Sequence, residues 1–224
     1  HSAKLQENLH RSIHLTTPMR CCLLITAHIL IVIMIISITI MENSPLPHPF
    51  VGRQRELGLL DEEHDAPGAR LVILYGRRRV GKTHLIQQWM ATHKIRSLYW
   101  VADPTSAADQ LSSFSQAVFQ FETGDEPPAD FTYGNWRVAL QRLARLAQNE
   151  RMVVAVDEFT YLMEVTPGIA GIFQNAWDQG LRQSRLILIL SGSHLGLMTR
   201  GALSYNAPLY GRATALLHLA PLPL

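Results

Sequence analysis

The sequence predicts an α/β protein in which a central, mostly parallel sheet lies between two layers of helices. Three observations predict this fold class. Short apolar runs recur along the chain, and longer segments with helical patterning separate them. A glycine-rich loop follows the first apolar run, and two acidic residues end the third. Strands that alternate with helices in this way form parallel sheets covered on both faces.

The elements are expected in a regular order along the chain. The predicted strands lie at residues 71–75, 97–102, 152–156, 186–190 and 214–219. The predicted helices lie at residues 53–65, 82–93, 106–121, 136–148 and 169–183. Pro67 and Gly68 end the first of these helices, and an acidic loop at 124–130 follows the third. No internal repeat at a fixed period is found.

Composition places the chain among ordinary globular proteins. It has 224 residues, 47% of them hydrophobic and 17% charged, which suits one domain with its own core. The net charge of +2 gives no general indication of nucleic-acid binding. The two cysteines, Cys21 and Cys22, are adjacent, which excludes a disulfide framework and a paired-cysteine metal site. The histidines show no metal-ligand spacing, and the absence of other cysteines fits a cytoplasmic protein.

Residues 1–42 form a hydrophobic N-terminal extension with two interpretations. The run from Cys21 to Met41 is long and apolar enough for a transmembrane helix, which would make the protein membrane-anchored. The basic residues before this run would, however, keep the amino terminus in the cytoplasm and place the following domain outside the cell. We therefore favour the interpretation that the residues before Met41 are untranslated upstream sequence read as protein, and that translation starts at Met41. Residues 43–49 are expected to be a Pro-rich linker, and residues 50–224 the folded domain.

The loop after the first predicted strand matches the phosphate-binding pattern G-x-x-x-x-G-K-[ST], the Walker A motif. Its residues are Gly76, Arg77, Arg78, Arg79, Val80, Gly81, Lys82 and Thr83. The glycines let successive backbone N–H groups face phosphate oxygens, and the following helix presents its positive end to the same anion. Lys82 is expected to reach the β- and γ-phosphates of ATP, and Thr83 to bind Mg²⁺. The three arginines either aid anion capture, contact nucleic acid or form a solvated basic loop.

Asp157 and Glu158 follow the third predicted strand, an arrangement typical of the Walker B motif. Carboxylates beside an apolar strand need a partner, and Mg²⁺ supplies one. Asp157 is expected to hold the metal, mostly through its water shell. Glu158 is expected to orient and polarise the attacking water. The consecutive acids favour an ATP-hydrolysing protein over a nucleoside kinase, and no Asn-Lys-x-Asp motif of GTPases is present.

Later polar residues are candidates for supporting roles. Ser191 and Ser193 follow the fourth predicted strand, and either could sense the γ-phosphate or hold the water. Arg212 and Arg200 are candidates for the arginine that stabilises transition-state charge, in their own chain or in a neighbouring subunit. If Arg212 acts on a neighbour's nucleotide, self-association is required for efficient hydrolysis.

Five segments in sequence order resemble the archaeal-type ATPase family, whose members are AAA+ and STAND-like P-loop ATPases. They are residues 50–57, 74–83, 157–159, 191–193 and 208–212. The resemblance implies the three-layer P-loop NTPase fold, with five parallel strands and the phosphate-loop strand central. It also implies that Val51 and Gly52 lie near the adenine. The family usually continues into a helical lid and a winged-helix region, so the domain is expected to be incomplete at its C-terminus. Its usual sensor residue is Asn, where this chain has Ser191.

These observations lead to two function hypotheses. The first is a switch or motor domain that binds ATP and hydrolyses it with Mg²⁺. The alternative is a nucleotide-binding regulatory module with little hydrolysis, either tethered to a membrane through residues 21–41 or associated with DNA or a signalling partner. ATP turnover that depends on Glu158 distinguishes the two hypotheses.

Overall fold

The computed structural model describes residues 52–222. The apolar run at 21–41, the linker at 43–49 and Val51 lie outside the described residues, so the predictions made for them remain predictions. Within residues 52–222, no helix has both the length and the apolar character needed to cross a bilayer.

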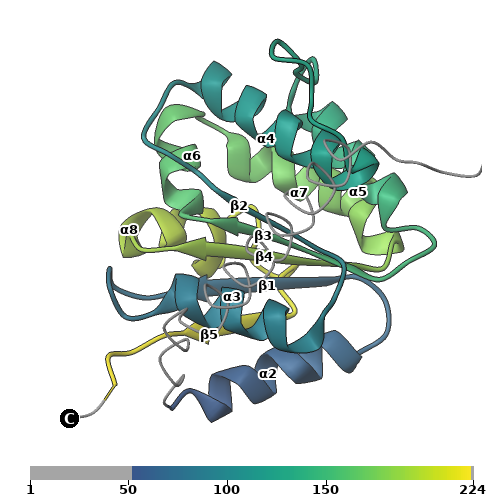
Figure 1. Ribbon diagram of the computed structural model, residues 1–224. Coiled ribbons are helices and arrows are strands. Elements are labelled where there is room, and N and C mark those ends of the chain that lie inside the picture. Colours follow the sequence, from purple (N-terminus) through teal and green to yellow (C-terminus); the bar gives the residue numbers. More distant parts are fainter. Residues whose placement is uncertain (1–51, 223–224) are drawn as a thin grey trace, which may run out of the picture. The chain divides into compact units, whose positions relative to one another are not determined.

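Five parallel strands form one sheet in the order β2-β3-β4-β1-β5 (Figure 1). The strands are β1 (Arg70–Tyr75), β2 (Ser97–Val101), β3 (Met152–Asp157), β4 (Leu186–Gly192) and β5 (Ala215–His218). Each lies where an apolar run predicts it. Because all five strands point the same way, the phosphate-loop motif and the acidic pair both lie at the carboxyl edge of the sheet.

The middle position of the sheet belongs to β4, so the expectation that β1 would be central is wrong. β1 lies between β4 and β5, and Leu74 of β1 is in register with Ser191 on one side and Leu217 on the other. The extent to which each strand is buried explains this strand order. All residues of β4 are buried, whereas Leu217 is the buried residue of β5, and a strand with so little buried surface suits the edge of a sheet.

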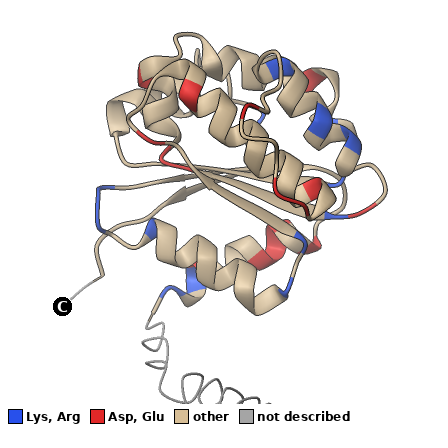
Figure 2. Cartoon of the chain, turned by 45° about the horizontal axis from the view of Figure 1, so that its top comes forward, with Lys and Arg blue, Asp and Glu red and all other residues tan. Residues whose placement is uncertain are grey.

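Helices cover both faces of the sheet and complete the predicted three layers (Figure 1). The helices of one face are α2 (Gln54–Asp65) and α3 (Lys82–His93). Those of the other face are α4 (Ala107–Thr123), α5 (Trp136–Leu146), α6 (Phe159–Val165) and α7 (Ile169–Gln179). Charged residues lie on the helices, on the loops and at strand ends, and the strand interiors carry none (Figure 2).

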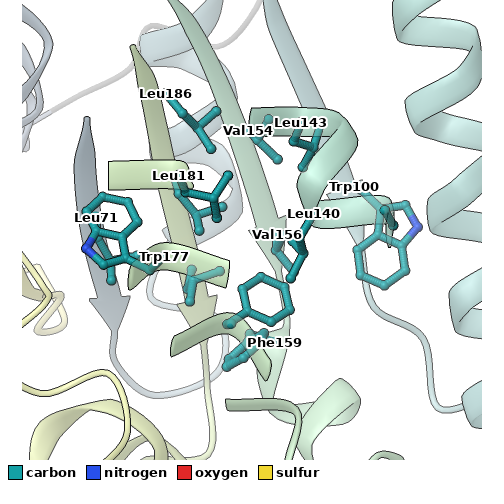
Figure 3. Packing of buried hydrophobic residues seen from close by; sticks show 14 of the residues in the cluster. Leu71, Trp100, Leu140, Leu143, Val154, Val156, Phe159, Trp177, Leu181 and Leu186 are labelled. Carbon is teal, nitrogen blue, oxygen red and sulfur yellow. The ribbon is translucent and has the colours of Figure 1, made fainter. Parts of the chain in front are cut away.

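Much of the core lies between the sheet and the layer formed by α4 to α7 (Figure 3). Trp100 of β2, Phe114 of α4 and Trp136 of α5 pack with ring centroids 5.0 to 6.0 Å apart. Leu140 and Leu143 of α5 are fully buried against them. Burial of one such leucine side chain stabilises the fold by about 1.5–3 kcal/mol, so this layer fixes β2 and β3 firmly in place.

Short elements account for the other differences from the predicted structure. The helix predicted to end at Gln183 ends at Gln179, and the turn Leu181–Gln183 follows Gly180. Neither α6, α8 (Leu195–Met198) nor the π-helical turn Thr199–Leu203 was expected. Each spans two turns or fewer, which is too short for a helical period to be visible in the sequence.

Candidate nucleotide-binding site

The loop from Gly76 to Gly81, which we call the phosphate loop, joins β1 to α3 at the carboxyl edge of the sheet. Gly81 has a φ of 95°, a conformation that favours glycine, and Arg79 also lies in the left-handed region with a φ of 64°. At Gly76 a Cβ atom would lie 2.3 Å from the carbonyl oxygen of Leu219, so this position requires glycine. No side chain caps the amino end of α3, which leaves its first backbone N–H groups facing the loop.

Lys82 begins α3 and lies almost wholly inside the phosphate loop, with 5% of its surface exposed. Its Nζ donates hydrogen bonds to the carbonyl oxygens of Gly76 and Arg77, both at 3.1 Å. Burial lowers the pKa of Lys82, and Arg78 lowers it further, while the charges of Glu158 and Asp157 oppose the change. The ammonium is therefore held by neutral carbonyl groups and is ready to pair with an anion.

Asp157 ends β3 and accepts hydrogen bonds from three other residues. The hydroxyl of Thr83 donates to its Oδ2 at 2.6 Å, the hydroxyl of Tyr99 donates to the same oxygen at 2.7 Å, and the backbone N–H of Glu158 donates to Oδ1 at 2.9 Å. Asp157 is 1% exposed. The contact with Thr83 joins two motifs 74 positions apart in the chain.

Glu158 lies just beyond β3 in a left-handed conformation, with a φ of 51°. Its Oε2 accepts a hydrogen bond of 2.7 Å from Ser193, which follows β4. Ser191 is fully buried within β4, and its hydroxyl has no hydrogen-bond partner among the described residues. Of the two serines that the sequence offered, Ser193 is therefore the one that contacts Glu158.

Two hollows meet at the phosphate loop. One has a volume of about 290 Å³ and is lined by Arg79, Gly81, Lys82, Thr83, His84, Gln87 and Glu158. The other has a volume of about 550 Å³ and is lined by Arg53, Arg77, Arg78, Arg79, Val80, Pro221 and Leu222. Since Arg79 lines both, one ligand with a polyphosphate group and a larger organic group could occupy the two together.

The oxygen donors suit Mg²⁺. Thr83 offers a hydroxyl and Asp157 a carboxylate, and hard divalent cations prefer such ligands. Among residues 52–222 there is no group of three or more His, Cys, Asp and Glu side chains that could hold a metal. Mg²⁺ bound with a nucleotide needs one or two protein carboxylates, because phosphates and water complete its shell.

Comparison with known proteins identifies the family. Residues 50–223 match the model of an ATPase domain found predominantly in Archaea. The chain belongs to this ATPase family. It is 30% identical over 173 residues to an uncharacterized protein of Methanocaldococcus jannaschii, MJECL04, a match that covers 77% of this chain and 36% of that protein. The ATPase domain described here thus spans about a third of that relative.

Solved structures share the fold of this ATPase domain. The Walker-type ATPase of Pyrococcus abyssi matches 75% of this chain and 53% of its own, with a TM-score of 0.53 and 23% identity. The ORC1 protein of Aeropyrum pernix, solved in complex with DNA, matches 80% of this chain and 47% of its own, with a TM-score of 0.52 and 18% identity. Both likenesses establish the α/β architecture.

The arginines of the ATPase domain have different surroundings. Arg78 donates to the hydroxyl of Tyr161 at 2.7 Å and lies over its ring, 5.7 Å from the centroid. Arg77 and Arg79 are exposed. Arg212 forms an ion pair with Asp178 of α7 at 2.7 Å and also donates to the carbonyl of Pro208, so its described contacts lie outside the phosphate loop.

Gly52 and Arg53 connect the start of the domain to its end. A Cβ atom on Gly52 would lie 3.3 Å from the side chain of Leu222. Arg53 has a φ of 66°, and its guanidinium donates to the carbonyls of Val80 in the phosphate loop and Ala220 beyond β5, at 2.9 and 2.7 Å. Arg53 therefore links the phosphate loop to the C-terminal segment.

Two residues of this site, Tyr99 and Arg53, were not predicted as site residues. Tyr99 lies in an apolar strand with no motif of its own. Its neighbours Leu98 and Trp100 are buried in the core, whereas Tyr99 faces the opposite side of the sheet with Asp157. Strand alternation could have indicated that face, but the pairing of β2 with β3 was needed to identify the partner.

Proposed function

We propose that this ATPase domain binds ATP together with Mg²⁺ and hydrolyses it to ADP and phosphate. The observation that carries the proposal is the 2.6 Å hydrogen bond from Thr83 to Asp157. It places the start of α3 against the carboxylate that ends β3, and Glu158 follows directly. The residues proposed to bind phosphate and the residue proposed to activate water are therefore close together, as phosphoryl transfer to water requires.

The phosphate loop would hold the polyphosphate. Backbone N–H groups at the uncapped start of α3 would bind phosphate oxygens, and Lys82 would exchange its two carbonyl partners for the β- and γ-phosphates. Arg77 and Arg79, which are exposed within the loop, would attract the anion from solution. Val51 and Gly52 would lie beside the adenine, and Gly52 is close to Leu222 at the larger hollow.

Thr83 and Asp157 would hold Mg²⁺, Thr83 directly and Asp157 through water. When bound, the metal would neutralise part of the negative charge of the phosphates. The hydroxyl proton of Thr83 already points to Asp157, so the lone pairs of Thr83 remain available to a cation.

Glu158 would accept a proton from the attacking water. The water oxygen forms a bond to the γ-phosphorus while the bond from that phosphorus to the bridging oxygen breaks, and ADP leaves. Ser193 donates to Oε2 of Glu158 and fixes the carboxylate, which leaves Oε1 free for the water. Arg212 would add positive charge only after it leaves Asp178, for example on contact with a neighbouring copy.

The second candidate function is a regulatory nucleotide-binding module with little hydrolysis. The contact between Glu158 and Ser193 favours it, because the serine hydroxyl already occupies one of the carboxylate oxygens that could accept a hydrogen bond from water. A DNA or signalling partner, and a membrane tether through residues 21–41, would belong to this second function as well as to the first.

Calorimetric titration with ATP and Mg²⁺ tests the proposal. We expect the wild-type protein to bind, Lys82→Ala to lose at least about 100-fold in affinity because charge-assisted bonds to two phosphates are removed, and Glu158→Gln to bind without releasing phosphate. Lys94→Ala is the matched control, since Lys94 caps the other end of α3 and is exposed. A folded wild-type protein that binds no ATP would overturn the proposal. Binding with equally slow phosphate release from wild type and Glu158→Gln would favour the regulatory module.

A further inference from the structure

Tyr99 connects β2 to the acidic end of β3. Its hydroxyl donates to Oδ2 of Asp157 at 2.7 Å, the same oxygen that accepts from Thr83 at 2.6 Å. The third donor, the backbone N–H of Glu158, binds Oδ1 at 2.9 Å. Three separate elements, β2, α3 and the turn after β3, thus fix one buried carboxylate.

The hydrogen bonds to Asp157 leave one acceptor position of its carboxylate unoccupied. Each carboxylate oxygen accepts about two hydrogen bonds. The hydroxyls of Thr83 and Tyr99 occupy both positions on Oδ2. On Oδ1, the N–H of Glu158 occupies one position. The remaining acceptor position is therefore on Oδ1, and the two hydroxyls prevent the carboxylate from rotating away from it.

We propose that Tyr99 is a positioning residue that fixes Asp157 and keeps one acceptor position on Oδ1 available to a metal-bound water. The inference rests on the proposed function, since it assigns Tyr99 to the same nucleotide site. Hydrogen bonds to a metal-binding carboxylate fix its rotamer and strengthen metal binding. Without the phenol, Thr83 alone would hold Oδ2, and Asp157 could turn about its side-chain bonds.

Tyr99→Phe tests this role, because it keeps the ring and removes one oxygen. A fluorescent ATP analogue is titrated first in EDTA and then at rising Mg²⁺ concentration. We expect unchanged affinity in EDTA and a Mg²⁺ concentration for half-maximal effect that rises about 10-fold, as is typical when a residue that supports a metal ligand is lost. Tyr133→Phe is the matched control, since it removes another half-buried phenol, one that lines a hollow between α4 and α5. It should leave both titrations unchanged.

A second variant separates positioning from packing. Tyr99→Leu removes the ring as well as the hydroxyl, so its Mg²⁺ requirement should match that of Tyr99→Phe if the hydroxyl carries the effect. Mn²⁺ in place of Mg²⁺ gives a direct readout, since the electron paramagnetic resonance of the nucleotide-bound ion should broaden in Tyr99→Phe. Thermal unfolding measured on each variant shows whether it is folded.

Failure of the inference can be distinguished from failure of the proposed function. If the wild-type protein binds the analogue and responds to Mg²⁺, but Tyr99→Phe has the same Mg²⁺ requirement, the positioning role is wrong and the proposed function stands. Equal losses of affinity in EDTA and in Mg²⁺, or a lowered Mg²⁺ requirement, also overturn the positioning role. If the wild-type protein does not bind the analogue at all, the proposed function fails, and this inference fails with it.

Discussion

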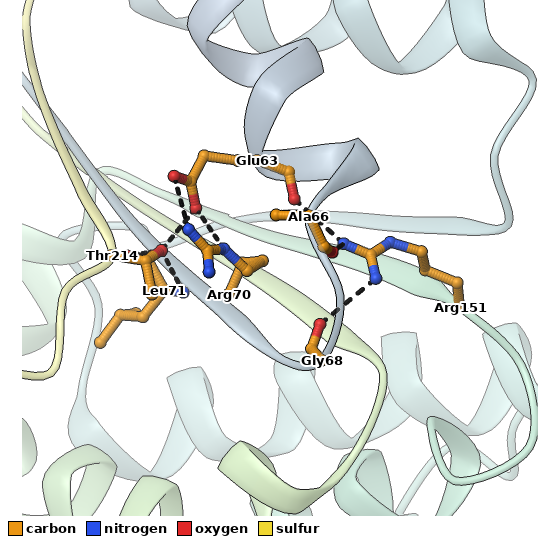
Figure 4. A network of polar contacts seen from close by, with 7 residues as sticks. All are labelled: Glu63, Ala66, Gly68, Arg70, Leu71, Arg151 and Thr214. Carbon is orange, nitrogen blue, oxygen red and sulfur yellow. Dashed lines mark hydrogen bonds and ion pairs between the residues drawn. The ribbon is translucent and has the colours of Figure 1, made fainter.

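Both edges of the sheet bury a carboxylate, but they surround it with different groups. At the amino edge, Glu63 of α2 receives two hydrogen bonds from the guanidinium of Arg70, at 2.7 and 2.9 Å, and one from the hydroxyl of Thr214 at 2.6 Å (Figure 4). Arg151 donates to the backbone carbonyls of Glu63, Ala66 and Gly68. This network connects α2 to the starts of β1 and β3 and to the residue before β5.

At the carboxyl edge, Asp157 receives its hydrogen bonds from neutral donors, and no described ion pair includes it. The nearby Lys82 is held by carbonyl groups instead of by the acids. Left-handed backbone at Arg79, Gly81 and Glu158 is concentrated in the same place. The amino edge pairs its charges within the protein, whereas the carboxyl edge keeps them separate, which is what binding of a charged ligand requires.

Replacing the buried carboxylate by an amide should affect stability much more at the amino edge than at the carboxyl edge. Glu63→Gln should lower the free energy of unfolding by about 2–3 kcal/mol, because it leaves Arg70 half-paired in a partly buried site. Asp157→Asn should change it by no more than about 1 kcal/mol, because the amide oxygen can still accept from the N–H of Glu158 and the two hydroxyls can turn to accept from the amide nitrogen. Urea unfolding of both variants at neutral pH measures the difference.

Nucleotide binding should show the reverse order for these two variants. Glu63→Gln should bind ATP with Mg²⁺ as the wild type does, and Asp157→Asn should lose the Mg²⁺-dependent part of its affinity. Equal destabilisation by both substitutions would remove the distinction between a structural edge and a binding edge.

Gly76→Ala tests how closely the phosphate loop packs on the strand beside it. The new methyl would lie 2.3 Å from the carbonyl oxygen of Leu219, the residue after β5, whose N–H donates to the carbonyl of Tyr75, so the segment that follows β5 must move. We expect a loss of about 2 kcal/mol in unfolding free energy and weaker ATP binding. Gly58→Ala in α2 is the control, because nothing lies within 4 Å of the added methyl, and it should stabilise the helix by up to about 1 kcal/mol.

The smallest expected effect is the change in the stability contribution of Glu63 at acidic pH. Burial on its own raises the pKa of Glu63, but hydrogen bonds from Arg70 and Thr214 and the charges of Arg70 and Arg151 lower it below its ordinary value of 4.5. A lowered pKa in the folded state means that the ionised form stabilises the fold above pH 4.5, and that this contribution is lost as pH falls through the folded-state pKa.

The unfolding free energies of wild type and Glu63→Gln should therefore differ by a constant amount at neutral and mildly acidic pH. The difference should shrink only when the pH falls below 4.5. Urea titrations over this range measure it. A difference that grows on acidification would show that the Arg70 contact does not favour the ionised form.

Local patterns in the sequence predicted most of the fold and pointed to most of the residues that the structure brings together in the candidate site. Continuous apolar runs identified β1, β3 and β4, because a strand buried on both faces has few polar positions. The partly exposed strands β2 and β5 were predicted from shorter runs that also contain polar residues. Fixed spacing of particular residue types identified two motifs, the loop from Gly76 to Thr83 and the pair Asp157 and Glu158. Such spacing is what close approach of a phosphate and binding of a metal would demand. Their meeting at one edge followed from parallel strands.

The sequence alone left open everything that depends on which strands are neighbours. The central position of β4, the choice of Ser193 over Ser191, the contact of Tyr99 with Asp157 and the pairing of Arg212 with Asp178 all join residues remote in sequence. Spacing along the chain carries no information about such contacts, because they form only when helices and strands pack. The amino acid sequence thus determined the residues that suit nucleotide chemistry, and the tertiary structure decided which of them lie together and which groups hold them in place.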